Sequence, residues 1–418
     1  MWDMASRLFP DPWPHNNMKP DAAIAVVREL RGHGHEAYLV GGCVRDMVMG
    51  IEPADYDVAT SALPEQIMKV FPRTEGIGAQ FGVVLVIYQG HPFEVATFRS
   101  DEAYIDGRRP SRVVFTDAKQ DVLRRDFTIN GLLYDPIEKR VIDFVHGQED
   151  IQAKLVRAIG DPRARFEEDK LRVLRAVRFG AKLGYTIEPA TWEAVRAMAS
   201  SIHQVSSERI RKELLRILTE GQAARGFHML ESSGLRAEIL PEIEFTDHLQ
   251  RCLAMLQPGI ERDFAMGVLL HETPISQVRD VVERLKFSRA QMHHIVALVE
   301  NFPQFYKVRK MSISSLKRFF RLVRFENHLE LARLHGVAAG EKLEEYGYAC
   351  RKHQEWTEAD IAPKPLISGE DLIALGFEPG PRFKEILTRV EDEQLEGQLV
   401  DHTQALNFVR RHYGDSKS

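Results

Sequence analysis

The segment Pro53-Ala54-Asp55-Tyr56-Asp57-Val58-Ala59-Thr60 places two aspartates one residue apart, downstream of Val40-Gly41-Gly42. Side chains alternate along a β-strand, so Asp55 and Asp57 are expected to share one face. Two carboxylates on one face can bind a hard cation such as Mg²⁺, which prefers oxygen ligands and usually keeps substrate phosphates in its coordination shell. The spacing therefore predicts that Asp55 and Asp57 are catalytic carboxylates that hold Mg²⁺.

A glycine pair and an arginine precede these aspartates. Gly41 and Gly42 allow the backbone to approach a phosphate closely, and Arg45 can pair with anionic oxygens. Gly-Gly, then Arg, then Asp-x-Asp is the layout of a palm domain that transfers nucleotides. Because an Asp-x-Asp alone is also common in surface turns, this interpretation depends on the other motifs of the chain.

Length and composition limit the class of protein. The 418 residues are enough for about two to four domains, and a hydrophobic content of 44% is ordinary for a globular chain. The formal net charge of −5 argues against a protein that coats nucleic acid indiscriminately, although it permits a local basic groove. No obligate protein partner is predicted.

The positions of the cysteines and the hydropathy of the chain indicate the cellular compartment. Cys43, Cys252 and Cys350 lie far apart, which predicts neither a disulfide framework nor a zinc site and fits the reducing cytoplasm. The chain contains no apolar run of the roughly 18 residues that a membrane span needs, so no such span is predicted. A cytoplasmic protein without a membrane anchor is expected.

The character of the sequence changes near residue 160. Before it, periodicity predicts helices at 21–31 and 63–71 and strands at 37–40, 83–88 and 93–98, with a turn at 89–92. After it, amphipathic helical patterns continue to the end. The segment 161–216 carries 12 Lys and Arg against 8 Asp and Glu. This local basic excess is either an RNA-facing surface or a solvated helical face.

Glu94 is a third candidate acid. On a strand, Glu94 shares its face with Ala96 and Phe98. An acid among apolar residues is costly to bury unless it is paired or binds metal. Glu94 is therefore predicted to join the catalytic carboxylates, and the alternative is a structural ion pair with an arginine.

A second cluster is Leu123-Arg124-Arg125-Asp126-Phe127-Thr128-Ile129-Asn130-Gly131. Asp126 can cap a following helix, while Arg124 and Arg125 project near its positive N-terminus. Backbone N–H groups and guanidinium forks that meet at one anion suit a triphosphate. A helix cap with solvated flanks is the alternative.

A third cluster runs from Glu168 to Phe179. Glu168, Arg172 and Arg175 fall on one helical stripe, and Asp169 lies one turn before Arg172. A carboxylate accepts from an exocyclic amine and a guanidinium donates to ring acceptors, so Asp169 and Arg172 together could read the edge of cytosine or adenine. The alternative is a salt bridge between residues three apart on one helix.

These motifs, in this order, resemble those of the class II tRNA nucleotidyltransferase/poly(A) polymerase family of the polymerase-β-like superfamily. Leu39 to Asp46 with Asp55-Tyr56-Asp57 resembles its first motif, Arg124 to Asn130 its ribose- and phosphate-binding motif, and Glu168 to Arg172 its base-selecting motif. Ile142 to Asp150 is similar to its head-to-neck hinge, and Pro365 to Leu372 with Gln394 to Gly397 is similar to its tail.

The resemblance implies an α+β fold, in which a polymerase-β-like palm with a mixed sheet and helices is followed by all-α neck, body and tail domains. The expected boundaries are an N-terminal extension at 1–20, the head at 21–160, the neck at 161–225, the body at 226–340 and a tRNA-binding tail at 341–418.

The implied reaction is attack of the tRNA 3′-hydroxyl on the α-phosphate of CTP or ATP, with release of pyrophosphate and a metal at Asp55 and Asp57. The partners are then CTP, ATP and the acceptor and T arms of tRNA, and the neck offers Arg209, Arg211, Lys212 and Arg216 as RNA-binding candidates. The expected nucleotide-binding residues are Gly41, Gly42, Arg45, Arg124, Arg125, Asp126, Asn130, Asp169, Arg172, Arg175 and Arg178.

Other specificities keep the same motifs. Addition of A alone and poly(A) synthesis are alternatives, and an RNA-binding protein without catalysis is an alternative of another class. The segment 99–113, with Asp106-Gly107-Arg108-Arg109-Pro110, resembles a flexible loop that enzymes restricted to adding two C residues lack. Leu269 to Thr273 faintly resembles a histidine-aspartate phosphohydrolase core, but His271-Glu272 replaces His-Asp, so no second metal site is predicted.

Overall fold

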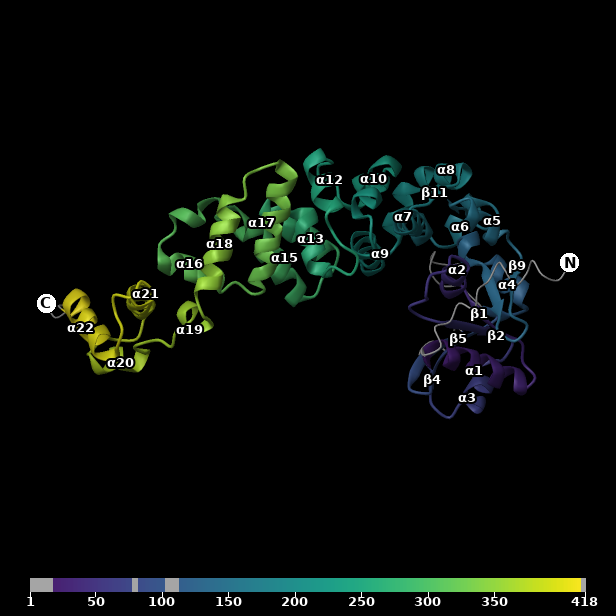
Figure 1. The fold of residues 1–418 in the computed structure, drawn as a ribbon, viewed down its shortest axis with the longest axis horizontal. Coiled ribbons are helices and arrows are strands. Elements are labelled where there is room, and N and C mark those ends of the chain that lie inside the picture. Colours follow the sequence, from purple (N-terminus) through teal and green to yellow (C-terminus); the bar gives the residue numbers. More distant parts are fainter. Residues whose placement is uncertain (1–17, 77–81, 102–112, 415–418) are drawn as a thin grey trace. The chain divides into compact units, whose positions relative to one another are not determined.

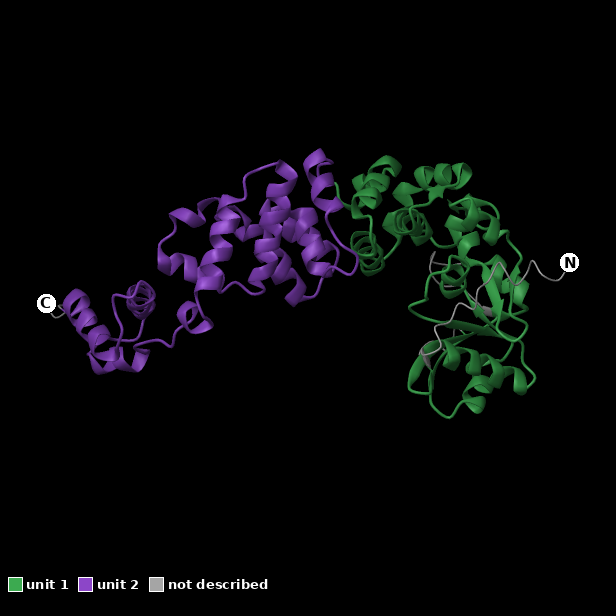
Figure 2. Ribbon diagram, viewed as in Figure 1, with its two compact units in different colours: residues 1–241 green, residues 242–418 purple. Residues whose placement is uncertain are grey.

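The computed structural model describes residues 18–76, 82–101 and 113–414. The chain forms two compact units, Met1–Pro241 and Glu242–Ser418, which are green and purple in Figure 2. Most of the expected N-terminal extension lies outside the described residues, as does the part of the predicted loop that contains Asp106 to Pro110.

A seven-stranded mixed sheet, with helices such as α1 (Met18–Gly32) and α3 (Pro64–Val70) beside it, forms the N-terminal part of the first unit (Figure 1). The strand order is β3-β4-β5-β2-β1-β8-β9, in which β2 and β5 are parallel and the other neighbours are antiparallel. The strands are β1 (Ala37–Val40), β2 (Asp57–Thr60), β3 (Thr74–Glu75), β4 (Val83–Tyr88), β5 (His91–Thr97), β8 (Leu132–Asp135) and β9 (Arg140–Asp143). Two further pairs are β6 (Arg99–Asp101) with β7 (Val113–Phe115), and β10 (Leu155–Val156) with β11 (Thr186–Ile187).

Helices cover this sheet. Helix α1 packs on β1 and β2, and α3 packs on β4 and β5 and against α1. Side chains from the sheet and from α4 (Ala118–Leu123) form a buried cluster of Val40, Ala59, Phe98, Ala118, Val122 and Leu133. The predicted α+β class is confirmed, and the elements predicted at 37–40 and 83–88 are found with those bounds.

Two local expectations need correction. The turn expected at 89–92 contains only Gln89 and Gly90, whose φ values of 50° and 83° let Tyr88 pair directly with His91, so β5 begins early. Asp55 precedes β2 instead of lying in it, although Asp55 and Asp57 are both exposed on either side of buried Tyr56.

The remaining helices of the first unit follow the sheet. They are α2 (Gly42–Val48), η2 (Thr128–Asn130), α5 (Gly147–Gln152), α6 (Pro162–Glu168), α7 (Leu171–Leu183), α8 (Pro189–Ala197), η3 (Ala199–Gln204), α9 (Ser207–Thr219), α10 (Ala223–Ser233) and α11 (Leu235–Ile239). Helices α7, α9 and α10 pack against one another, because each buries one apolar stripe.

The second unit is helical throughout its described residues. Its helices are α12 (Asp247–Ala254), α13 (Arg262–Leu270), α14 (Ile275–Arg284), α15 (Arg289–Asn301), η4 (Phe302–Lys310), α16 (Ile313–Phe320), α17 (Phe325–Ala339), α18 (Glu344–Glu355), α19 (Glu358–Ile361), α20 (Gly369–Ala374), α21 (Pro381–Leu395) and α22 (His402–Tyr413). One buried cluster runs from Phe305 to Ala349 and another from Ile367 to Val409. In the described parts of the chain, every helix is too short or too polar to cross a bilayer.

Gly226 lies where α7, α9 and α10 meet, so a Gly226→Ala substitution tests this packing. A Cβ at Gly226 would lie 2.4 Å from Ile217 Cγ2 and 3.2 Å from Ala181 Cβ. We expect the overpacking to cost about 1–3 kcal/mol and to lower Tm in calorimetry. Gly32→Ala is the control, since a Cβ there meets nothing within 4 Å. Equal Tm values for the two variants would contradict this packing.

Candidate active site

One cleft in the first unit brings the predicted nucleotide-binding residues together. Its volume is about 490 Å³, and it is lined by Gly41, Gly42, Arg45, Asp57, Arg124, Arg125, Asp126, Asn130, Asp169, Arg172, Arg175, Arg178, Phe179, Lys182 and Arg216. Eight of these side chains are Arg or Lys and three are Asp. The excess of positive charge makes the cleft a suitable site for a polyanion such as a triphosphate.

The glycine pair forms one wall of the cleft. Gly41 has φ 76°, a conformation that favours glycine, and a Cβ there would lie 3.1 Å from Arg125 Nη1. Gly42 begins α2, which carries Arg45. Arg45 is 4% exposed, pairs with Asp46 at 2.6 Å and donates through Nη1 to Asn130 Oδ1 at 2.8 Å. These contacts fix the Arg45 guanidinium beside the glycines.

Arg124 and Arg125 are held by a residue that was not predicted. Both pair with Asp121, at 2.7 Å and 3.0 Å, and Asp121 is 1% exposed. Burial works to raise the pKa of Asp121, but the two guanidinium groups hold it below its usual value. The spacing of three and four residues along a helix could have identified Asp121 from the sequence.

The expectation that Asp126 caps a following helix is wrong. Phe127 occupies the cap position of the short turn η2, and Asp126 Oδ1 accepts from the Phe127 N–H at 2.8 Å. Its Oδ2 accepts from Arg175 Nη2 at 2.5 Å and Nε at 2.8 Å. Burial opposes ionisation, but the charges of Arg175 and Arg172 bring the pKa of Asp126 to about 2, so it stays a carboxylate.

Asp169 and Arg172 do not form the salt bridge that is the alternative to their recognition of a base. The helix breaks at Asp169, between α6 and α7, so helical spacing does not apply across it. Asp169 Oδ1 accepts from the Leu171 N–H at 3.1 Å, and its Oδ2 accepts from Arg209 at 2.7 Å. Arg172 instead pairs with Glu168 at 2.6 Å. Asp169 and Arg172 therefore both line the cleft, and each is held there by a different partner.

Arg178 supports the far wall of the cleft. Only 2% exposed, it pairs with buried Glu213 at 2.7 Å and lies 4.2 Å from the centre of the Phe179 ring. Burial lowers the pKa of Arg178 to about 10, which leaves it charged at neutral pH. Phe179 and Lys182, which also line the cleft, were not predicted, because their positions in α7 carry no distinguishing pattern.

The four RNA-binding candidates do not share one environment. Arg209 is bonded to Asp169, and Arg216 lines the cleft and pairs with Glu220. Lys212 is exposed and Arg211 is half-buried on the same helix α9. Arg209 and Arg216 thus belong with the cleft, whereas Lys212 faces solvent.

Of the three acidic candidates, Asp57 and Glu94 are neighbours on adjacent strands, whereas Asp55 pairs with a lysine. Asp57 lines the cleft and is paired in register with Glu94 across the parallel strands β2 and β5. The Asp55 side chain is 88% exposed and pairs with Lys19 at 2.9 Å. Among the described residues, the groups of three or more possible metal ligands within 4.8 Å of one another do not include these acids.

Asp57 nevertheless has the electrostatics of a cation ligand. Desolvation and then the Glu94 carboxylate raise its pKa to about 6, and Arg125 acts in the opposite direction. A divalent cation would relieve this repulsion, and carboxylate oxygens are suitable donors for Mg²⁺. The Asp57 carboxylate is therefore suited to bind a metal ion. Asp55 would become a second ligand if the ion replaced Lys19 as the partner of its carboxylate.

Three family models match successive parts of this chain. Residues 37–157 match a family model described as the poly A polymerase head domain, residues 184–246 match one described as "Probable RNA and SrmB- binding site of polymerase A", and residues 262–409 match domain 2 of tRNA nucleotidyltransferases. A CCA-adding enzyme of Geobacillus sp. (strain WCH70) is 32% identical over 92% of this chain and 95% of its own length.

The chain belongs to the CCA-adding enzyme family. The nucleotidyltransferase family expected from the motifs is thereby confirmed, and such enzymes use a divalent metal. The CCA-adding enzyme of Levilactobacillus brevis is 33% identical over 92% of this chain and 96% of its own.

Solved structures of CCA-adding enzymes share the fold. The Bacillus stearothermophilus enzyme in complex with CTP superposes with a TM-score of 0.78 at 26% identity, covering 96% of this chain and all of that one. The Thermotoga maritima enzyme complexed with tRNA has a TM-score of 0.65 at 19% identity and covers 97% of this chain and 98% of its own. The order of a head followed by helical domains is therefore common to these CCA-adding enzymes.

The raised pKa of Asp57 predicts that Asp57→Asn stabilises the metal-free protein. Because the folded-state pKa lies above the ordinary value, the ionised carboxylate destabilises the fold at pH values above about 6. After allowance for solvent screening at this exposed side chain, we expect a gain on the order of 1 kcal/mol at pH 7.5. The gain should shrink as the pH falls through about 6 and should vanish below about pH 3, where the carboxylate is protonated in both the folded and the unfolded state.

Urea denaturation in EDTA at the two pH values measures this effect. Asp55→Asn is the matched control, since its carboxylate is exposed and already paired with Lys19, so no gain is expected there. An Asp57→Asn protein less stable than wild type at pH 7.5 would show that the carboxylate is not electrostatically strained.

Proposed function

We propose that this protein adds C, C and A from CTP and ATP to the 3′ end of tRNA without a template, and releases pyrophosphate. The observation that carries the proposal is the cationic cleft beside Asp57, in a chain that matches CCA-adding enzymes over nine-tenths of its length. The relatives are named for CCA addition, which suggests the product, and the cationic side chains of the cleft suit the binding of a nucleoside triphosphate.

The arginines bind and orient the triphosphate. Arg45, Arg124 and Arg125 line the cleft near the glycine pair, and Asp46 or Asp121 fixes each guanidinium in advance. Donors that are already oriented cost little reorganisation when charge develops on the leaving pyrophosphate. Mg²⁺, bound through Asp55 and Asp57, would lower the pKa of the tRNA 3′-hydroxyl and neutralise phosphate charge. Glu94, the register partner of Asp57, reinforces the negative potential there.

Asp169 and Arg172 distinguish the bases. Asp169 accepts from Arg209 and from the Leu171 N–H. Arg172 donates through Nη1 to Glu168 and through Nη2 to the Arg124 carbonyl. Both side chains are therefore oriented before a nucleotide arrives. A carboxylate that accepts from an exocyclic amine, beside a guanidinium that donates to ring acceptors, suits cytosine and adenine alike. Uracil and guanine present the opposite pattern at the matching edge.

The tRNA backbone contacts the exposed neck surface and the helical second unit. Lys212 and Arg211 on α9 are the proposed phosphate contacts of the neck. The three free thiols fit the reducing cytoplasm as the compartment in which the enzyme acts.

Product length decides between the alternatives. Purified protein with tRNA ending at the discriminator base, at C or at CC, with CTP, ATP or both, should yield CCA from each substrate. Addition of A to the CC substrate alone would favour an A-adding enzyme, and long A tracts would favour a poly(A) polymerase. No extension of any substrate would favour an RNA-binding protein.

Asp57→Ala should abolish addition of nucleotides and leave tRNA affinity largely unchanged, because the carboxylate holds the metal while tRNA contacts lie elsewhere. The measurement is single-turnover extension alongside filter binding of tRNA. Glu65→Ala, on the exposed surface of α3, is a carboxylate control that should retain full turnover. Near-normal turnover of Asp57→Ala with Mg²⁺ would refute the metal assignment.

Asp169→Ala should raise misincorporation of UTP and GTP relative to CTP and ATP. Loss of the acceptor removes about 1–3 kcal/mol of discrimination, measured as the ratio of kcat/KM values. Lys212→Ala is the control on the neighbouring helix α9. It should leave base preference unchanged and flatten the slope of log tRNA affinity against log salt by about one. Unchanged base preference in Asp169→Ala would make this residue a helix cap only.

A further inference from the structure

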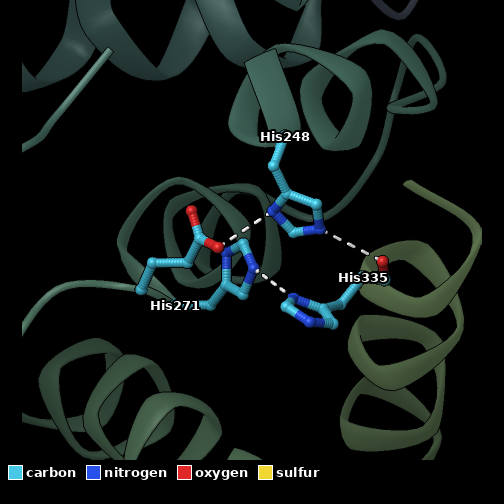
Figure 3. Close-up of side chains that lie close together, drawn as sticks. His248, His271 and His335 are labelled. Carbon is cyan, nitrogen blue, oxygen red and sulfur yellow. Dashed lines mark hydrogen bonds and ion pairs between the residues drawn. The ribbon is translucent and has the colours of Figure 1, made fainter. Parts of the chain in front are cut away.

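Three histidines and a glutamate converge inside the second unit, far along the chain from the nucleotide cleft. His248 lies in α12, His271 follows the last turn of α13, Glu272 comes next, and His335 lies in α17. One ligand atom from each lies within 4.8 Å of all the others. Figure 3 shows the three imidazole rings turned toward one another. Local sequence patterns indicate no partners for His271, because His248 and His335 are separated from it by 23 and 64 residues.

Hydrogen bonds orient two of the three rings for coordination. His271 Nδ1 lies 2.7 Å from the Val268 carbonyl, so Nδ1–H donates there and Nε2 carries the lone pair. His248 Nε2 likewise lies 3.2 Å from the His335 carbonyl, which leaves the lone pair on Nδ1. A backbone carbonyl that fixes the second nitrogen is the usual support of a metal-binding histidine.

The third ring completes the set. His335 Nε2 lies 2.8 Å from the Tyr306 hydroxyl, and His335 Nδ1 lies 3.0 Å from His271 Nε2. Without an ion, His335 Nδ1–H donates to His271 Nε2 and His335 Nε2 accepts from the Tyr306 hydroxyl. An ion would select the other tautomer, in which Nε2–H donates to Tyr306 and both Nδ1 and His271 Nε2 present lone pairs to the metal. Burial is the main cause that lowers the pKa of His271 and of His335 to about 4, so both rings are uncharged at neutral pH.

Glu272 supplies the negative charge. Its Oε1 lies 2.9 Å from His248 Nδ1, yet that nitrogen is buried and has no hydrogen-bond partner among the described residues. The two atoms are therefore close without being aligned as donor and acceptor, as expected of two ligands of one ion. The Glu272 side chain is 42% exposed and gives an ion a path from solvent.

We propose that His248, His271, Glu272 and His335 bind a divalent transition metal ion of the zinc class. Three imidazole nitrogens and one carboxylate oxygen match the tetrahedral donor sets of Zn²⁺ and differ from the all-oxygen sets of Mg²⁺. Ligand atoms around tetrahedral zinc lie roughly 3.4 Å apart, so small side-chain rotations complete the geometry. Four protein ligands leave no open position, so the site is structural.

A second group of possible metal ligands differs from the histidine cluster, because an arginine side chain lies among its members. Glu261, Asp263 and His294 also lie within 4.8 Å of one another. The Arg324 guanidinium pairs with Glu261 and lies 3.2 Å from His294 Nδ1, so a cation already occupies that position. The ion pair within the histidine cluster joins His248 to Glu272 and involves no Lys or Arg.

The proposed ion would hold together three elements of the second unit. Helices α12 and α17 and the end of α13 contribute one ligand or more each, so the metal would resist their separation. Since the cluster is remote in sequence from Asp55 and Asp57, its occupancy should affect stability without supplying a catalytic group.

Cobalt titration of the full-length protein tests the proposal. After removal of metals with a chelator, we expect about one equivalent of Co²⁺ to bind with intense visible d–d bands typical of tetrahedral coordination, and Zn²⁺ to displace it. Zn²⁺ should also raise Tm, because an ion that binds only the folded state stabilises it. Asp57→Asn should keep the spectrum, which separates this site from the catalytic metal.

The double variant His248→Gln/His335→Gln should lose both the cobalt bands and the Tm shift. His402→Gln is the control, because His402 also pairs with a carboxylate, Asp371 at 3.0 Å, in the same unit. If the double variant fails to fold, Glu272→Gln, which changes only the exposed ligand, should weaken Co²⁺ binding at least tenfold. Absence of cobalt bands in wild type, or equal bands in wild type and the folded variant, would show a hydrogen-bonded histidine cluster only.

Discussion

The ion pair between buried Asp126 and half-buried Arg175 is the interaction on which the rest of the cleft depends. Asp126 belongs to the segment after α4 and Arg175 to α7, and two hydrogen bonds of 2.5 Å and 2.8 Å join them. Removal of Arg175 would leave the buried Asp126 carboxylate unpaired. Such a loss costs about 3–5 kcal/mol in a fully buried pair and less here, because the Arg175 side chain is 29% exposed. The pair therefore fixes the segment that carries Arg124 and Arg125 against the helix that carries Arg172 and Arg178.

The same carboxylate also organises the glycine wall. Asp126 Oδ1 accepts from Asn130 Nδ2 at 3.3 Å, and Asn130 Oδ1 accepts from Arg45 at 2.8 Å. A single buried acid thus connects α2, η2 and α7. Since the cations of the cleft pair with acids, among them Asp46, Asp121 and Glu213, they keep their positions despite mutual repulsion. This preorganisation suits the binding of a triphosphate, whose charge is high and whose reaction demands exact alignment.

Local patterns were enough to predict much of this arrangement. The strand at 37–40, the glycine pair and the arginines of both motifs could be found because each signal lies within a few residues. Distant partners could not be found in this way. Arg209 reaches Asp169 across 40 residues, and the break between α6 and α7 removes the helical spacing that had linked Asp169 to Arg172. The histidine cluster was missed because tertiary packing alone assembles it.

A double-mutant cycle on CTP affinity tests the central claim most directly. The dissociation constant for CTP is measured by calorimetry for wild type, Asp126→Asn, Arg175→Gln and the double variant. If the ion pair orders the cleft, the two substitutions are strongly non-additive, with a coupling energy of roughly 0.5–3 kcal/mol, because the second change removes a partner already lost. Additive effects would show that Asp126 and Arg175 act on the nucleotide separately and would contradict the account.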